Sequence, residues 1–211
     1  MTFNINSFRN FGLNQGGARP SMFEVNFPLI PGSAAGNSQE LQRLSALCQA
    51  ASLPASNVAE IDVPYFGRRI KFSGERVFDD WVVTILNDED FSARDMFEAW
   101  YNSINMLVDN ITPTEDLLAY KVDGVEVFQY GKGGDIIRSY MFFGMWPKTV
   151  SDIRLDWGQT NQMEVFEVRF SLDFWIPTIA DGAINTIGYR GSESELGTVG
   201  GGNPPERLIA T

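Results

Sequence analysis

The stretch that decides the fold is Glu164–Trp175, which reads EVFEVRFSLDFW. After the first residue, its even-numbered positions are all apolar. Its odd-numbered positions include Glu167, Arg169, Ser171 and Asp173. Successive side chains of a β-strand point to opposite faces, so this period of two predicts one long strand with a buried face and a wet face.

Two shorter alternating segments lie on either side of a turn. Over residues 58–63, Glu60 and Asp62 alternate with apolar residues, and over residues 69–75 basic and polar residues alternate with apolar ones. The residues between the two segments are Pro64, Tyr65, Phe66, Gly67 and Arg68. This order predicts an antiparallel hairpin. Glu60 and Asp62 can pair across it with Arg69 and Lys71.

The other expected elements are mostly strands. Residues 81–86 form a more apolar strand that we expect to be buried on both faces. Weaker strands are expected at 23–27, 118–122, 125–130, 138–143 and 153–157.

One helix is expected after Ser92, because Ser92 followed by Asp95 resembles a capping box. Its apolar stripe is Met96, Phe97, Trp100, Ile104 and Leu107, which we interpret as core packing. Residues 38–49 fit either a helix or an extended segment.

The composition excludes several kinds of chemistry. The 211 residues contain no histidine and one cysteine, Cys48, and carry a formal net charge of -11. Without histidine there is no Ser-His-Asp triad, and with one cysteine there is no Cys₂His₂ or Cys₄ zinc site. The acidity disfavours a large basic surface for gripping nucleic acid. Cys48 lies among apolar residues and is interpreted as a buried structural thiol.

The remaining polar motifs have structural interpretations. Residues 131–134 lack the spacing of a phosphate-binding loop and predict a hairpin turn. The acids at 88–90 suit the start of a helix. Asp79 and Asp80 are adjacent on an extended chain and point apart, which suits a turn or a subunit contact better than acid–base catalysis. No catalytic residue, metal site or cofactor is therefore predicted.

The composition divides the chain into three parts. These are residues 1–37, rich in Asn, Gly, Ser and Pro, residues 38–176, which hold most of the charge, and residues 177–211, which are too polar to build their own core. We expect an N-terminal arm at 1–19, a single β domain at 20–177 and a Gly-rich C-terminal extension at 178–211. No signal peptide is expected, and no apolar run reaches the roughly 18 residues of a membrane span.

Several short motifs, in order and spacing, resemble one known family. The first block is Ala51-Ser52-Leu53-Pro54, Val63-Pro64, Gly67-Arg68-Arg69-Ile70-Lys71, Arg76-Val77-Phe78-Asp79-Asp80-Trp81 and Asn87-Asp88-Glu89. The second block is Gly144-Met145-Trp146-Pro147, Leu155-Asp156-Trp157, Phe166-Glu167-Val168 and Leu172-Asp173-Phe174-Trp175. Over residues 20–177 the chain is similar to the tail tube proteins of contractile-tailed bacteriophages, a family related to the type VI secretion tube protein.

The resemblance implies a fold and an assembly. The fold is mainly β, with two antiparallel sheets in a β-barrel or sandwich, one flanking α-helix and an extended segment at 46–52. The assembly is a hexameric ring whose inner strands close around a lumen. Rings stack into a tube inside a contractile sheath. The implied partners are the chain itself, the tail sheath, baseplate and tail-terminator proteins, and viral DNA that passes without specific binding. No enzyme activity, cofactor or membrane binding is implied. The location is the virion tail, after synthesis in the host cytoplasm.

Site residues follow from placing the motifs in such a ring. The candidate lumen residues are Glu60, Asp62, Glu167, Arg169 and Asp173. A predominantly negative wall would repel phosphate and let DNA slide. The candidate inter-ring contact is the hairpin Pro64–Arg69, because aromatic and arginine residues are enriched at interface hot spots.

Alternative functions remain open at this point. Within the same class, the chain could be a baseplate tube initiator or a secretion-system tube subunit. In a different class, it could be a β-barrel ligand-binding module.

Overall fold

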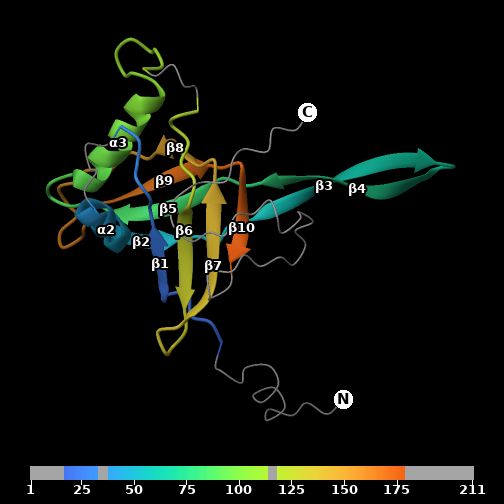
Figure 1. Cartoon of the computed structure of the whole chain (residues 1–211), viewed down its shortest axis with the longest axis horizontal. Helices are drawn as coiled ribbons and strands as arrows, with labels where there is room; N and C mark the ends of the chain where they lie inside the picture. The colour runs from blue at the N-terminus through green and yellow to red at the C-terminus, as the bar shows by residue number, and fades with distance from the viewer. Residues whose placement is uncertain (1–16, 33–37, 114–117, 179–211) are drawn as a thin grey trace, which may run out of the picture.

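The computed structural model describes residues 17–32, 38–113 and 118–178. Two four-stranded antiparallel sheets pack against each other, which confirms the mainly β fold class (Figure 1). The first sheet has the order β1 (Phe23–Asn26), β6 (Val125–Tyr130), β7 (Ile136–Phe143) and β10 (Phe174–Thr178). The second has the order β2 (Cys48–Ala51), β5 (Trp81–Leu86), β9 (Val165–Ser171) and β8 (Trp146–Val150).

The alternation that predicted the fold is real in β9. Phe166, Val168 and Phe170 are buried, whereas Glu167 and Arg169 are exposed on the outer face of the second sheet. The expected single strand over 164–175 is wrong, however. The strand ends at Ser171, and the chain crosses to the first sheet, where it continues as β10.

Asp173 and Gly144 form the corner at which the chain changes sheets. The backbone N–H of Asp173 donates to the carbonyl of Phe143 at 3.0 Å. Gly144 has a φ of 62°, and a Cβ there would lie 2.1 Å from Asp173 Oδ2. The close approach requires glycine at position 144, so the corner depends on two residues far apart in the sequence.

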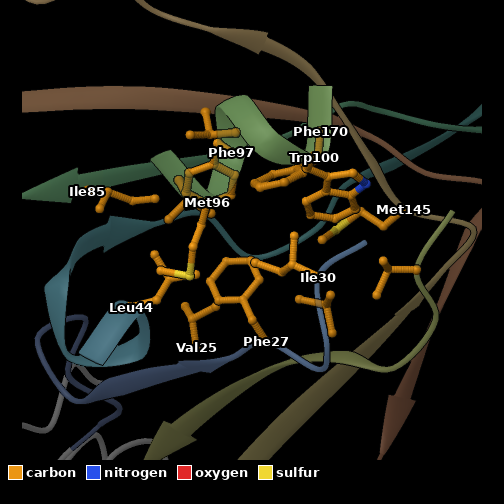
Figure 2. Packing of buried hydrophobic residues seen from close by; sticks show 14 of the residues in the cluster. Val25, Phe27, Ile30, Leu44, Ile85, Met96, Phe97, Trp100, Met145 and Phe170 are labelled. Atoms are coloured by element: carbon orange, nitrogen blue, oxygen red, sulfur yellow. The ribbon is translucent and has the colours of Figure 1, made fainter. Parts of the chain in front are cut away.

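Aromatic residues fill the space between the sheets (Figure 2). Trp81, Trp100, Phe97, Phe142 and Phe170 are all fully or almost fully buried. Each buried indole N–H has a carbonyl partner, since Trp81 Nε1 donates to Ser52 at 2.6 Å and Trp100 Nε1 to Tyr120 at 2.7 Å. The core is thus continuous from both sheets into the neighbouring helix.

That helix is α3 (Ser92–Ile104), and it buries Met96, Phe97 and Trp100 as expected. Leu107 lies beyond its end and is exposed, so its place in the core stripe is wrong. The capping-box interpretation is also wrong. The N-cap is Phe91, in a left-handed conformation with no side-chain cap bond, and the Ser92 hydroxyl instead donates to Asp88 Oδ2 at 2.6 Å.

A second helix, α2 (Ser38–Leu47), precedes β2. The segment that fitted either a helix or a strand therefore contains both, and the expected strand at 46–52 is correct only for 48–51. Leu44 is fully buried, which explains why a helix with one apolar face forms here. Within the described residues, two helices accompany the sheets where one was expected.

Other differences concern the weak strands. Residues 118–122 form a turn with one bridge, between Val122 and Met145, and residues 153–157 contain no strand. The alternate residues of β5 are only partly buried, so burial on both faces is wrong. The strand β8 had no alternating signal and was not predicted. The expected turn at 131–134 is confirmed between β6 and β7.

The arm at 1–19 and the extension at 178–211 lie almost entirely outside the described residues. Their boundaries stay predictions.

Candidate assembly interface

The most exposed part of the described structure is a long hairpin. Its strands, β3 (Ser56–Tyr65) and β4 (Arg68–Phe78), project away from the two sheets on the side opposite the helices (Figure 1). They pair with each other and, within the described residues, with no other strand. The turn consists of Phe66 and Gly67, whose φ values of 43° and 77° suit a two-residue hairpin turn. The predicted hairpin is confirmed.

One face of the hairpin is polar. Asp62 lies opposite Lys71, and Pro64 lies opposite Arg69. Lys71 Nζ forms an ion pair with Glu60 Oε2, and Arg69 Nη1 lies 3.6 Å from Asp62 Oδ2. The expected cross-strand pairing is confirmed, because Glu60 lies beside Lys71 and Asp62 lies beside Arg69.

The other face is apolar and has no partner in the described chain. Val63 lies opposite Ile70, and Ile61 lies opposite Phe72. These four side chains are between 42 and 55% exposed. The alternation predicts which residues share this face, but it carries no information on whether the face is covered.

The tip of the hairpin carries aromatic and basic side chains. Phe66 is 91% exposed, and its ring lies 4.6 Å from that of Tyr65, perpendicular to it. A bulky residue in the left-handed region is strained, and Asn is preferred at this place in such a turn. Arg68 and Arg69, which follow in the sequence, are also exposed. The tip therefore exposes a large aromatic side chain on a strained turn residue.

Asp79 and Asp80 lie at the root of the hairpin, in the connection from β4 to β5. Asp79 accepts hydrogen bonds from Asn57 Nδ2, the shorter at 2.9 Å, and Asp80 pairs with Lys148 at 2.9 Å. Trp175 Nε1 donates to the carbonyl of Ala55 at 3.3 Å, so β10 also holds the root. These contacts connect a projecting element to the folded body.

The other candidate lumen residues lie away from the hairpin strands. Glu167 and Arg169 are on the outer face of the second sheet, in β9. Asp173 lies at the corner between β9 and β10, where both its oxygens accept from Lys121 Nζ at 2.8 Å. The structure thus distributes these candidates over three separate elements.

The described residues offer little for catalysis. Burial raises the pKa of the Cys48 thiol to about 12, so it stays protonated at neutral pH, and its Sγ donates to the carbonyl of Leu44 at 3.5 Å. In the described ranges, no three His, Cys, Asp or Glu side chains are grouped to hold a metal ion. No helix among them is long and apolar enough to cross a membrane.

Solved structures share this fold. The cap that terminates the tube of the anti-feeding prophage has a TM-score of 0.55 at 15% identity, covering 79% of this chain and 93% of that one. A chain of the anti-feeding prophage baseplate has a TM-score of 0.52 at 11% identity, covering 78% and 97%. The chain therefore shares its fold with the tube cap and a baseplate chain of the anti-feeding prophage.

Sequence comparison is more specific. The family model described as phage tail tube protein matches residues 18–178. The tail tube protein gp19 of Enterobacteria phage T4 is 33% identical over 162 residues, which cover 75% of this chain and 90% of that protein. Its counterpart in Enterobacteria phage T6 is 34% identical over the same coverage.

The chain belongs to the phage tail tube protein family. This confirms the resemblance that the sequence motifs carry. The family is one of structural components of the virion tail, not of enzymes.

Proposed function

We propose that the chain forms the inner tube of a contractile tail as hexameric rings stacked inside a sheath, with viral DNA passing through the lumen. Family membership supports the tube role. The matched region covers nine-tenths of the length of the T4 and T6 tail tube proteins. The sheath, the baseplate and a tail terminator are the proposed partners. The arm and the extension are proposed to lie outside the tube domain, at ring contacts or on the exterior.

The observation that carries the proposal is the uncovered apolar face of the hairpin, formed by Ile61, Val63, Ile70 and Phe72. A patch of exposed apolar side chains on a projecting ribbon marks an interaction site. Both edges of the β3–β4 ribbon are also unpaired within the described chain, and such edges readily pair with another chain. A neighbouring copy covers both features at once.

The tip of the hairpin is proposed as the contact between rings. Pro64, Tyr65, Phe66, Gly67, Arg68 and Arg69 make up this tip. The strained Phe66 supports a contact role, because the turn alone would be more stable with Asn. Arg68 adds a charge with no ion pair among the described residues.

The polar face of the hairpin is proposed to face the lumen, with Glu60 and Asp62 beside Lys71 and Arg69. Glu167, Arg169 and Asp173 stay candidates for the same wall. DNA binds protein when free Lys and Arg side chains neutralise its phosphates and release the cations condensed on them. The ion pairs of Arg69 with Asp62 and of Lys71 with Glu60 leave few such free side chains on this face. The net charge of -11 adds repulsion of the phosphates. We expect a predominantly negative wall that DNA passes without adhering.

The hairpin proposal is tested with two neighbouring residues on opposite faces. Phe72→Lys places a charge on the apolar face, and Ser73→Lys places the same charge on the polar face. Negative-stain electron microscopy of the purified variants should show tubes for Ser73→Lys and none for Phe72→Lys. Equal tube formation by both variants would show that the apolar face is not needed for assembly.

The wild-type images also separate the alternatives. Long tubes support the main tube subunit, and isolated rings support a baseplate initiator. A monomer at high protein concentration supports a ligand-binding module.

The lumen assignment has its own test in tubes of a Cys48→Ala, Asp62→Cys variant. A small maleimide should label Cys at position 62 and a bulky polymer-linked maleimide should not. Rapid labelling by both reagents would place this face on the exterior.

A further inference from the structure

A second exposed apolar element lies at the opposite side of the molecule from the hairpin. The loop between β8 and β9, residues 151–164, exposes Leu155, Trp157 and Met163. Trp157 is fully exposed and has no aromatic partner within the described chain. The core does not use it, and the hairpin assembly does not explain it.

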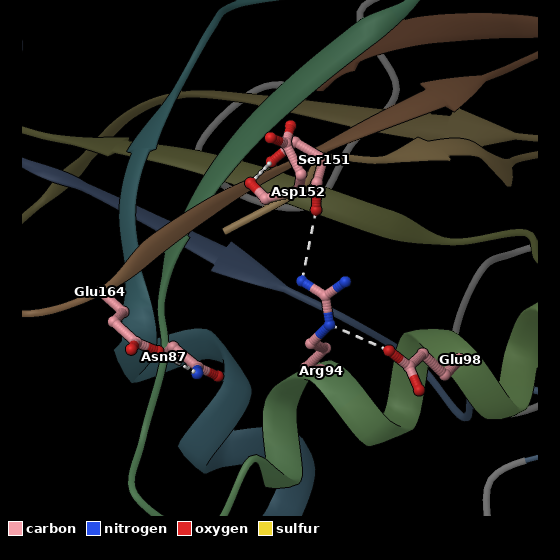
Figure 3. A network of polar contacts seen from close by, with 6 residues as sticks. All are labelled: Asn87, Arg94, Glu98, Ser151, Asp152 and Glu164. Carbon is pink, nitrogen blue, oxygen red and sulfur yellow. Dashed lines mark hydrogen bonds and ion pairs between the residues drawn. The ribbon is translucent and has the colours of Figure 1, made fainter. Parts of the chain in front are cut away.

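The loop is held at both ends (Figure 3). Arg94, in the first turn of α3, donates to the carbonyl of Ser151 at 3.2 Å and pairs with Glu98 at 2.9 Å. At the other end, Asn87 donates from its side chain to Glu164 Oε2 at 3.0 Å and from its backbone to the Glu164 carbonyl at 2.9 Å. The anchors place the loop beside the N-terminal end of α3.

The residues around Trp157 are also ordered locally. The Asp156 side chain accepts from the N–H of Gly158 at 2.9 Å, and its carbonyl accepts from the N–H of Gln159 at 3.1 Å. A large aromatic side chain on an already ordered loop loses little entropy on binding. Trp157 therefore has the properties of an anchor residue for an interface.

A cavity of about 480 Å³ lies at the C-terminal end of α3. Its lining residues include Pro31, Ala99, Asn102, Ser103, Pro113 and Tyr120. The segment after the helix exposes Leu107, Val108 and Ile111 next to it in sequence. A mostly apolar, open cavity beside exposed apolar residues is suited to an aromatic side chain.

We propose that Trp157 of one copy of this chain inserts into the cavity at the C-terminal end of α3 of the next copy. The loop and the cavity are at opposite ends of one helix, so the contact joins unlike surfaces, head to tail. Such a contact repeats from copy to copy and produces rings or helical filaments. A member of a tube family requires contacts of this kind, which is why a second copy is the occupant.

One charge pair fits the same contact. Arg154, beside the apolar loop residues, has a largely exposed side chain whose ion pair, with Asp156, is long at 4.0 Å. Asp109 is exposed in the segment that follows α3, and no ion pair within the described residues involves it. Arg154 and Asp109 are therefore each available to pair across the contact, while the loop also carries the acids Asp152, Asp156 and Glu164. The inference rests on self-assembly but not on the hairpin contact.

The test joins the two surfaces covalently while leaving Trp157 in place. Gly158 is next to Trp157, and a Cβ there meets nothing closer than 3.4 Å, so Gly158→Cys fits. Asn102 is exposed at the cavity. Each change is made in a Cys48→Ala background. Tubes assembled from a mixture of Gly158→Cys and Asn102→Cys copies are oxidised and examined by non-reducing electrophoresis.

A crosslinked dimer in the mixture, and a ladder from chains carrying both changes, would support the contact. The matched control replaces Gly158→Cys with Lys132→Cys, in the β6–β7 turn, and should give no dimer. Wild-type-like tubes without the Gly158–Asn102 dimer would overturn the inference while leaving the proposed function intact. Failure of the wild-type chain to assemble at all would count against both.

The contribution of the indole is measured separately. Trp157→Ala should raise the protein concentration needed for tubes by about tenfold or more, and Trp157→Phe by less. An unchanged concentration for Trp157→Ala would overturn the inference.

Discussion

The strand β9 and the hairpin strand β4 show the same sequence pattern with opposite outcomes. In β9, Phe170 alternates with charged residues and is completely buried against the first sheet and α3. In β4, Phe72 alternates with charged residues and is 55% exposed. The two differ in whether the chain itself supplies a covering layer. An alternating strand thus has one apolar face that is stable when buried, and the surface that buries it can belong to another copy of the chain.

The largest expected effect concerns the buried apolar face of β9. Phe170→Ala should lower the free energy of unfolding by about 3–5 kcal/mol, because it leaves a cavity among Trp81, Phe97 and Trp100. Phe72→Ala should change the stability of the unassembled chain by less than about 0.5 kcal/mol. Chemical denaturation monitored by tryptophan fluorescence measures both. A large loss for Phe72→Ala would show that the chain covers this face itself.

A smaller effect is expected at the exposed tip of the β3–β4 hairpin. Phe66→Asn should stabilise the unassembled chain by about 1 kcal/mol, because Asn adopts the left-handed conformation with less strain. The same change should reduce tube formation, because it removes the exposed ring from the hairpin tip. Thermal unfolding and electron microscopy measure the two quantities on one preparation. Parallel changes in stability and assembly would contradict the contact role of Phe66.

The smallest effect concerns the polar face. Asp62→Asn removes the partner of Arg69 on an exposed surface and should alter stability by only about 0–1 kcal/mol. Its effect should appear in the assembled tube, where an unpaired Arg69 gains attraction for phosphate. Retention of short DNA by tubes in low salt should rise in the variant and fall again in high salt. Arg69→Gln provides the control and should not increase retention.

Much of the local structure was predictable from particular residues. The alternation of Glu167 and Arg169 with Phe166 and Phe170 defined the faces of β9, and the turn at Phe66-Gly67 defined the register of the hairpin. These features depend on side-chain period and turn chemistry, which are properties of short segments. The helix α3 was predicted for the same reason, by the spacing of Phe97 and Trp100.

The errors share one physical origin. The break after Ser171 depends on Gly144, which is distant in sequence, and the expected cap failed because Ser92 bonds to Asp88 instead. The segment at 153–157 has strand-like composition but forms the loop that Arg94 and Asn87 anchor from other elements. Each outcome was decided by a contact with a residue outside the local pattern. A pattern of neighbouring residues contains no information about such contacts.

By itself, the sequence determined the class of the protein: a mainly β chain without catalytic histidine, with motifs of a tail tube protein and faces of fixed polarity. Side-chain period, composition and the order of short motifs suffice for this, because they do not depend on what surrounds each strand. Only the tertiary structure decided which apolar faces are covered. It buried that of β9, exposed that of the β3–β4 hairpin, and left Trp157 and the cavity beside Tyr120 at opposite ends of α3. Burial is a property of the packed layers, and packing brings together residues that the sequence keeps far apart.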